Sequence, residues 1–284
     1  MHFSVPCPTV ARMPSADPSR VGCQPVGARW PAGVQAAWTY REGGVSVGPW
    51  SSFNLGDHVG DDPLAVASNR QRLATACGVR PVFLRQVHGS AVCRLQPDTP
   101  DGVQADACWT DQAGLACTVL VADCLPILFA APGGASVAAA HAGWRGLAGR
   151  QGHGVLEALC EQWPAVQRPA DRSRTTVWLG PCIGPRQFEV GEDVRQAFLS
   201  SDAASVAHFV PRAPTPTGPD RYLADLPALA RRRLMRLGFT VIDGNDGSAA
   251  WCTVSQPSWF FSHRRDTARL GGSGRMAALI WRRP

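Results

Sequence analysis

The sequence lacks a Cys-x-x-Cys pair, a regular spacing of its ten cysteines and any long apolar run. The cysteines therefore predict no disulfide framework. No segment approaches the roughly 20 apolar residues that a membrane-spanning helix needs. The first residues are interrupted by prolines and lack the continuous apolar region of a secretory signal. These absences predict a soluble, cytoplasmic protein in a reducing compartment, with no membrane partner.

Histidine is also scarce, with seven residues and no His-x-His pair. This scarcity argues against a copper oxidase with several copper centres, because imidazole is the usual copper ligand. Pro181-Cys182 has no second cysteine at the spacing that zinc nucleobase deaminases require. The net charge is +6, but the arginines are scattered and no basic stripe is interleaved with aromatics. That distribution favours small anionic ligands over nucleic acid.

With 284 residues, the chain is long enough for one large domain or two small ones. Residues 1–28 are rich in Pro, Ser and small side chains and have no clear period, so they predict a disordered N-terminal extension. No internal repeat or clean boundary follows. We therefore expect residues 29–284 to form a single mixed α/β domain, a mixed sheet flanked by helices.

Apolar periodicity and turn residues predict the elements. The expected helices span 63–76, 147–163, 190–200 and 223–237. The expected strands span 34–39, 82–88, 91–95, 117–121, 127–130, 136–140, 176–179, 239–242, 259–262 and 276–281. Asp62 and Pro63 are start signals for the first helix, and Gly78 is its stop signal. Residues 91–95 are expected to form a hairpin with 82–88.

Three reactive side chains follow apolar runs at the points where turns begin. Cys124 lies between two such runs, His141 ends a third, and His88 ends a fourth. Rigid scaffolds usually present reactive groups at such places. One thiolate and two imidazoles suit a zinc ion that keeps a fourth position open for water or substrate. Asp123 can then orient a ligand.

Other interpretations of these residues stay open. Cys124 and a histidine can form a nucleophile–base pair without metal, or the three can be a buried cysteine and two hydrogen-bonded histidines. Arg145 follows His141 closely and can meet a phosphate or carboxylate, or stack on its neighbouring Trp at the surface. Arg264, beside Arg265 and Asp266, can belong to an anion clamp or to a buried ion network.

Many short motifs together carry a resemblance. The chain resembles the bacterial purine nucleoside phosphorylases that were once labelled multicopper polyphenol oxidases or laccase-domain proteins. The matching pieces lie in the family's order over about residues 34–281. They are Arg41 to Ser46, Asn54 to Pro63, Asn69-Arg70, Gln86 to Gly89, Ala122 to Pro126, His141 to Gly146, Gly180 to Gly184, Asp225-Leu226, Cys252-Thr253, Phe261 to Asp266 and Gly274-Arg275.

The resemblance implies an α/β domain similar to cysteine-hydrolase-like toxin domains. It implies phosphorolysis of adenosine, inosine, guanosine and S-methyl-5′-thioadenosine, with adenosine deamination at the same site. His88, Cys124 and His141 match the family's metal site, with zinc expected and copper as the alternative metal. His263 stands where the family is expected to carry an aromatic residue.

Phosphorolysis requires a site for phosphate and ribose. The candidate contacts are Arg41, Arg264, Arg145 and Asn54, and Asp123 or a metal-free histidine can move the proton. The expected partners are purine nucleosides and phosphate, and the expected state is a monomer. Alternatives from other classes are a copper-dependent phenol oxidase, a metal-free Cys–His hydrolase and a non-catalytic nucleoside-binding module.

Overall fold

The computed structural model describes residues 22–213 and 219–283. Most of the predicted extension, residues 1–21, lies outside the described residues. The remainder of that stretch contains strand β1 (Cys23–Pro25), which pairs antiparallel with β2 (Val34–Thr39). Paired structure therefore starts upstream of the boundary that we expected at residue 28.

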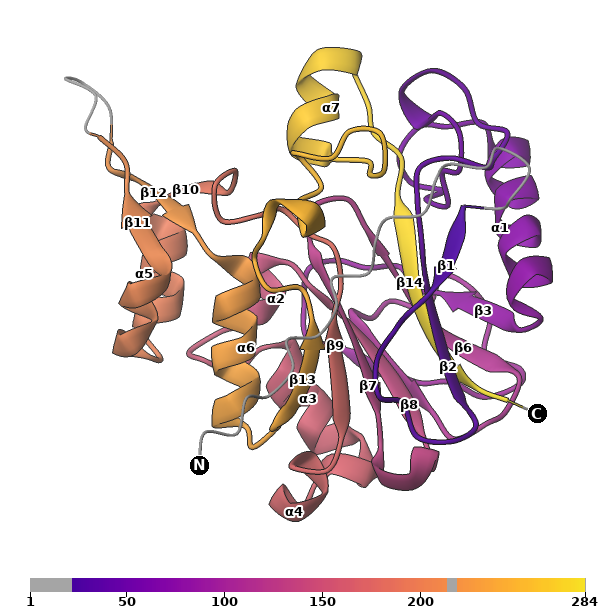
Figure 1. The fold of residues 1–284 in the computed structure, drawn as a ribbon, viewed down its shortest axis with the longest axis horizontal. Helices are drawn as coiled ribbons and strands as arrows, with labels where there is room; N and C mark the ends of the chain where they lie inside the picture. The colour runs from indigo at the N-terminus through magenta and orange to yellow at the C-terminus, as the bar shows by residue number, and fades with distance from the viewer. Residues whose placement is uncertain (1–21, 214–218, 284) are drawn as a thin grey trace, which may run out of the picture.

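One large sheet has five strands in the order β1-β2-β14-β6-β3. β14 spans Met276–Arg282, β6 spans Leu115–Val121 and β3 spans Arg80–Phe83. β14 runs antiparallel to β2 and β6, whereas β3 runs parallel to β6. The last strand of the chain thus lies in the middle of the sheet, between segments from its first half (Figure 1).

The other large sheet has six strands in the order β13-β9-β7-β8-β5-β4. Their bounds are Val241–Gly244, Thr176–Leu179, Leu125–Ala130, Val137–Ala142, Ala107–Thr110 and Val92–Arg94. The two outer pairs, β13 with β9 and β4 with β5, are parallel, and the inner pairs are antiparallel. Both large sheets are therefore mixed.

The two sheets pack against each other through a shared apolar layer. Cys117 and Val119 of β6 point into it from one side, and Leu128 and Ala130 of β7 from the other. The intervening residues of each strand face outward into further cores, such as Leu120 of β6. A strand buried on both faces needs apolar residues at every position, which is why these strands read as unbroken apolar runs.

Helices cover the two outer faces. Helix α1 (Pro63–Cys77) covers the five-stranded sheet, and α3 (Val155–Gln162) and α6 (Leu226–Arg236) cover the other. α1 and α6 consequently lie on opposite sides of the molecule (Figure 1). Asp62 caps α1 by accepting a hydrogen bond from Leu64 N, as its position before Pro63 predicted.

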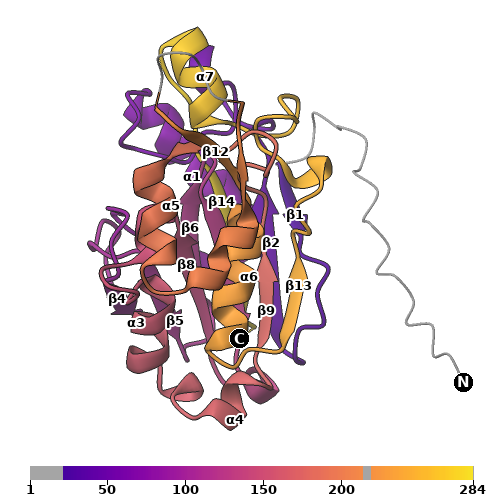
Figure 2. The ribbon, with the colours of Figure 1, turned by 90° about the vertical axis from the view of Figure 1, so that its left-hand side faces the viewer.

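The remaining elements lie around this core. They are α2 (Trp144–Ala148), α4 (Pro169–Arg172), α5 (Glu192–Leu199), α7 (His263–Leu270) and the strands β10 (Glu189–Gly191), β11 (Phe209–Pro211) and β12 (Arg221–Ala224). Strands β10, β12 and β11 form a small sheet that projects beside α5 (Figure 1). Figure 2 shows the molecule from the side of α5 and α6.

The mixed α/β class is confirmed, but several element predictions were wrong. β4 pairs with β5 instead of forming a hairpin with β3. The helix expected over 147–163 is interrupted between α2 and α3, where Gly149 and Gly152 adopt positive φ. Residues 259–262 lead from a turn into α7 and form no strand. The single sheet that we expected is replaced by two large packed sheets and a small third sheet.

The crossing from one sheet to the other occurs at Ala122, Asp123 and Cys124. β6 belongs to the five-stranded sheet, and β7, which follows directly, belongs to the six-stranded sheet. Only these three residues connect β6 to β7, so Cys124 lies where the two sheets meet. Among the residues that the structure describes, no helix is long and apolar enough to cross a membrane.

Asn69 of α1 binds the loop before α1 through buried hydrogen bonds, and its substitution tests how much these bonds stabilise the protein. Its fully buried amide accepts a hydrogen bond from Val45 N and donates to Ser46 Oγ and to the carbonyls of Ser52 and Asn54. Asn69→Ala leaves these buried groups unpaired, so we expect a loss of about 2–4 kcal/mol in the free energy of unfolding, measured by urea denaturation.

The matched control is Gln71→Ala, which removes an exposed amide from the same helix. We expect a change of about 0.5 kcal/mol or less there. Equal losses for the two variants would show that the buried hydrogen bonds of Asn69 contribute nothing to stability.

Candidate metal and catalytic site

The structure brings His88, Cys124 and His141 together from three separate segments. Their donor atoms all lie within 4.8 Å of one another, and Cys124 Sγ lies 3.6 Å from His88 Nε2. The imidazole rings of the two histidines meet edge to face, with their centroids 4.8 Å apart. His141 is buried, Cys124 is half-buried and His88 is exposed. The group therefore has one open side.

A carboxylate that the sequence analysis did not assign, Asp106, supports the group from behind. Its Oδ1 lies 2.9 Å from His141 Nδ1, and the two oxygens accept backbone N–H bonds from Val87, His88 and Gly89. A proton on Nδ1 leaves the lone pair of His141 Nε2 free for the site. The signal in the sequence was a single acidic residue among apolar ones, directly before β5.

Local backbone conformation helps to aim the side chains. His88 and Asp123 both have positive φ, at 60° and 91°, which is uncommon for residues with a Cβ. Such conformations cluster at functional sites. Gly143, at the start of α2, leaves the site open: a Cβ there would lie 2.7 Å from the His88 ring and 3.0 Å from Cys124 Sγ. A larger residue at Gly143 would therefore push the ligands apart.

The charges at the site favour a reactive thiolate. Burial by itself would raise the pKa of Cys124, but the facing His141 and His88 outweigh it and lower the pKa to about 6. Burial works against the charged form of His141 as well. The Cys124 thiolate and the Asp106 carboxylate nevertheless raise the pKa of His141 to about 9. In the metal-free protein, the two groups therefore form a thiolate–imidazolium pair at neutral pH.

The same three side chains can hold a metal ion. Donor atoms that share one tetrahedral zinc lie roughly 3.3–3.6 Å apart, given bond lengths of about 2.0–2.3 Å. The 3.6 Å separation of Cys124 Sγ and His88 Nε2 matches this spacing. Within residues 22–213 and 219–283, these three residues are the single group of three such donors. Three protein ligands and an open side suit a catalytic ion better than a structural one.

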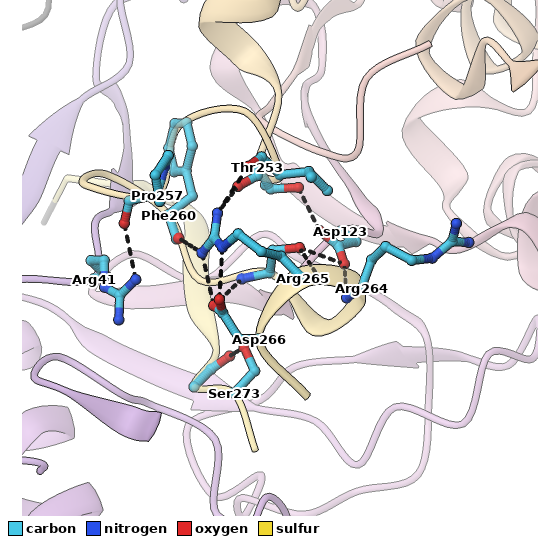
Figure 3. Close-up of polar contacts among 12 residues, drawn as sticks. Arg41, Asp123, Thr253, Pro257, Phe260, Arg264, Arg265, Asp266 and Ser273 are labelled. Carbon is cyan, nitrogen blue, oxygen red and sulfur yellow. Dashed lines mark hydrogen bonds and ion pairs between the residues drawn. The ribbon is translucent and has the colours of Figure 1, made fainter. Parts of the chain in front are cut away.

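Asp123, which we expected to orient a ligand, has its hydrogen-bond partners outside the His88–Cys124–His141 group. Its carboxylate accepts hydrogen bonds from Thr253 Oγ1 at 2.5 Å, Ser262 Oγ at 3.1 Å and Arg264 N at 2.7 Å. These hydrogen bonds hold the first turn of α7 against Asp123, which directly precedes Cys124 (Figure 3). The carboxylate that orients a histidine in this structure is Asp106.

The predicted arginines do not converge on one point. Arg41 donates to the carbonyls of Ser51 and Pro257 and lies over Phe261, whereas Arg264 donates to the carbonyl of Glu189. In Figure 3 the two arginines lie on opposite sides of the pair formed by Arg265 and Asp266. Arg265 belongs to a buried ion pair with Asp266, at 2.6 Å, and also binds backbone carbonyls.

Three further residues complete the surroundings. Arg145 is exposed on α2 and stacks over Trp144, and no acceptor binds its guanidinium among the described residues. Asn54 is buried with both amide atoms engaged, one of them by Arg275 N. The half-buried Arg275 was assigned no role from the sequence. Burial lowers the pKa of Arg275, and the nearby charges of Cys124 and Asp123 raise it in part.

One open hollow lies elsewhere, between α1 and β3. It encloses about 520 Å³ and is lined by Arg70, Arg80 and Phe83 among others. Both arginines are already engaged. Arg70 binds Leu55 O and pairs with Asp57 and Asp101, and Arg80 binds carbonyls of the neighbouring loop. The hollow contains no residue of the His88–Cys124–His141 group.

Comparisons with known proteins agree with the motifs. Residues 35–283 match the family model described as multi-copper polyphenol oxidoreductase laccase. The purine nucleoside phosphorylase PA4543 of Pseudomonas aeruginosa is 46% identical over 251 residues, covering 88% of this chain and 94% of that protein. The purine nucleoside phosphorylase YfiH of Escherichia coli is 44% identical over 254 residues, covering 88% and 95%.

A solved structure agrees as well. The Neisseria meningitidis protein NMB0706 superposes with a TM-score of 0.80 at 39% identity, covering 93% of this chain and all of that one. The resemblance inferred from the motifs is confirmed over nearly the whole described chain.

The lowered pKa of Cys124 predicts how fast iodoacetamide alkylates it in the chelator-treated protein. Because only the thiolate reacts, the rate should be half-maximal near pH 6 instead of about 8.5, and should fall as the pH drops below 6. Peptide mapping by mass spectrometry would follow the modification of each cysteine.

The half-buried Cys93 is an internal control, because burial raises its pKa. Asp106→Asn should move the Cys124 midpoint upward by about one pH unit, since a neutral amide supports the imidazolium of His141 less. If Cys124 titrated together with Cys93, the thiolate–imidazolium pair would be disproved.

Proposed function

Because the chain belongs to the family described as multi-copper polyphenol oxidoreductase laccase, and because relatives at 46% and 44% identity are named purine nucleoside phosphorylases, we propose that it is a zinc-dependent purine nucleoside phosphorylase. The proposed substrates are adenosine, inosine, guanosine and S-methyl-5′-thioadenosine, each with phosphate. We propose adenosine deamination as a second reaction at the same site.

The observation that carries this proposal is the converging group of His88, Cys124 and His141, with Asp106 behind it. One thiolate and two imidazoles are the donors that zinc prefers among common metals. A multicopper centre would need several such groups, and the described residues contain one. The donor set therefore favours the phosphorylase over the phenol oxidase.

In phosphorolysis, the bond between C1′ and the purine nitrogen breaks, and a bond from a phosphate oxygen to C1′ forms. The protein must place phosphate close to C1′ and stabilise the charge on the departing purine. Arg145 is the strongest of the predicted arginines for phosphate. It follows His141 closely in the chain, and its exposed guanidinium carries no competing acceptor among the described residues. Arg275 is proposed for the same role because the charge of Cys124 acts on it, although its guanidinium also donates to the carbonyls of Ser273 and Gly274.

Arg41, Arg264 and Asn54 are weaker candidates for substrate contacts. Arg41 and Arg264 each donate to backbone carbonyls, so a substrate would compete with those bonds. Both amide atoms of Asn54 are engaged within the protein, so we propose for it an indirect role, through the backbone of Arg275. We propose Asp123 as a positioning residue for Cys124, since its carboxylate is saturated by α7 and its neighbours.

Deamination replaces the amino group at C6 of adenine by oxygen from water. A zinc ion held by His88, Cys124 and His141 would supply this reaction with a water of lowered pKa, about 7. The residues of the chain would hold the ring in place and move the proton. His141 is fixed by Asp106 and cannot swing, so the exposed His88 is the more mobile of the two imidazoles.

One observation favours a second candidate, a metal-free Cys–His hydrolase. The lowered pKa of Cys124 and the raised pKa of His141 are those of an activated nucleophile and its partner. The two candidates differ in their response to a chelator. Chelation should abolish a zinc-dependent reaction and leave a metal-free one intact, while alkylation of Cys124 should abolish both.

The decisive test is to incubate zinc-loaded protein with adenosine, with and without phosphate, and to separate the products by chromatography. Adenine and ribose-1-phosphate should appear only with phosphate, and inosine or hypoxanthine should report deamination. Cys124→Ala should lower both rates by about 10²-fold or more. Cys93→Ala, at a half-buried cysteine outside the group, should keep both. Unchanged adenosine with folded, zinc-loaded protein would contradict the proposed function.

Zinc affinity tests the site independently of turnover. Asp106→Asn should weaken zinc binding by about 10–100-fold, because the amide orients His141 less firmly. Competition with a chromophoric chelator would measure the change, and a melting curve would verify that the variant is folded. The matched control is Asp111→Asn, at the opposite end of β5, whose carboxylate binds the exposed Arg94. Equal affinities for all three proteins would exclude the assigned role of Asp106.

A further inference from the structure

Two cysteines that are far apart in the sequence lie in contact beside the face of the five-stranded sheet that α1 covers. Cys23 is the first residue of β1, and Cys77 is the last residue of α1. Their Sγ atoms are 3.6 Å apart, although 54 positions separate them in the chain. A disulfide bond requires about 2.05 Å, so a movement of about 1.5 Å by the side chains would suffice.

The surroundings of the pair leave it open to reaction. Both residues are half-buried and border the apolar core between α1 and the five-stranded sheet. Cys108 and Cys117 are also adjacent, but both are completely buried in the layer between the sheets and out of reach of a dissolved oxidant. Exposure therefore distinguishes Cys23 and Cys77 from the buried pair.

The two thiols are also chemically unequal. The hydrogen bond between them raises the pKa of Cys23 and lowers the pKa of Cys77. The thiolate is the attacking form in thiol–disulfide exchange, so Cys77 is the better attacking group and Cys23 the better resolving group.

We propose that Cys23 and Cys77 form a reversible disulfide that fastens β1 to the end of α1. The inference is independent of the proposed function, since neither residue belongs to the His88–Cys124–His141 group. The oxidant is a small-molecule disulfide such as oxidised glutathione. The bond would close a long loop that contains β2 and most of α1.

The reaction proceeds in two exchanges. The Cys77 thiolate attacks one sulfur of oxidised glutathione, whose S–S bond breaks, and one glutathione thiolate leaves. Cys23 then loses its proton to solvent and attacks the Cys77 sulfur, so the second glutathione leaves. Two protein thiols are oxidised by two electrons, and one glutathione disulfide is reduced to two thiols.

The test is to equilibrate the full chain with glutathione buffers of increasing oxidised fraction, and then to quench and digest it. Mass spectrometry should find a peptide that links Cys23 to Cys77, and added reductant should remove it. Cys23→Ser should trap one glutathione on Cys77, because the resolving thiol is missing. Cys77→Ser should yield no cross-link at Cys23.

The melting temperature provides a second readout. The oxidised protein should melt roughly 5–10 °C above the reduced one, because the cross-link restricts the unfolded chain. The double variant with serine at both positions should melt alike in both buffers. Free thiols at Cys23 and Cys77 under conditions that modify Cys93, or a cross-link to a different cysteine, would overturn the proposal. An unchanged melting temperature of the linked protein would overturn the fastening of β1 to α1.

Discussion

The buried carboxylate of Asp106 holds two of the three donor residues at once. It accepts three backbone N–H bonds from the turn at residues 87–89 and contacts Nδ1 of His141. Burial raises the pKa of Asp106, yet these hydrogen bonds and the charge of His141 lower it overall, so the group stays ionised. An ionised carboxylate can fix both a strained backbone turn and an imidazole tautomer.

The position of Asp106 follows from strand pairing. β5 and β8 run antiparallel with Ala107 opposite Ala140, and His141 N donates to Asp106 O at 2.7 Å. The two residues are therefore neighbours whenever this register forms. The third donor, Cys124, arrives by a different route, because the chain crosses from one sheet to the other directly before it. The register of β5 and β8 thus sets the position of His141, and the crossing between the sheets sets the position of Cys124.

This origin explains how much the sequence could predict. Apolar runs followed by Cys124 and His141 located strand ends, since that information is local. The division into two sheets was not predictable, because strands buried on both faces look alike whichever sheet they join. Asp106 was missed because its partners lie 17 to 35 positions away. The pairing of β5 with β8 brings His141 close, and the turn at residues 87–89 lies close where β4 pairs with β5. Asp123 was considered because it stands next to Cys124, but the partners of its carboxylate, Thr253, Ser262 and Arg264, lie 130 to 141 positions away and could not be read from the sequence.

Asp123 links the C-terminal part of the chain to the segment that carries Cys124. Its carboxylate binds the first turn of α7, and its backbone carbonyl accepts a hydrogen bond from Ile183 N. Cys124 follows immediately, so the thiol is held between two anchors from the second half of the chain. α7 supplies no donor to the metal group, yet its first turn is hydrogen-bonded to Asp123, whose φ is positive. The C-terminal segment therefore contacts the residue directly before the reactive cysteine, although all three donors lie within residues 88–141.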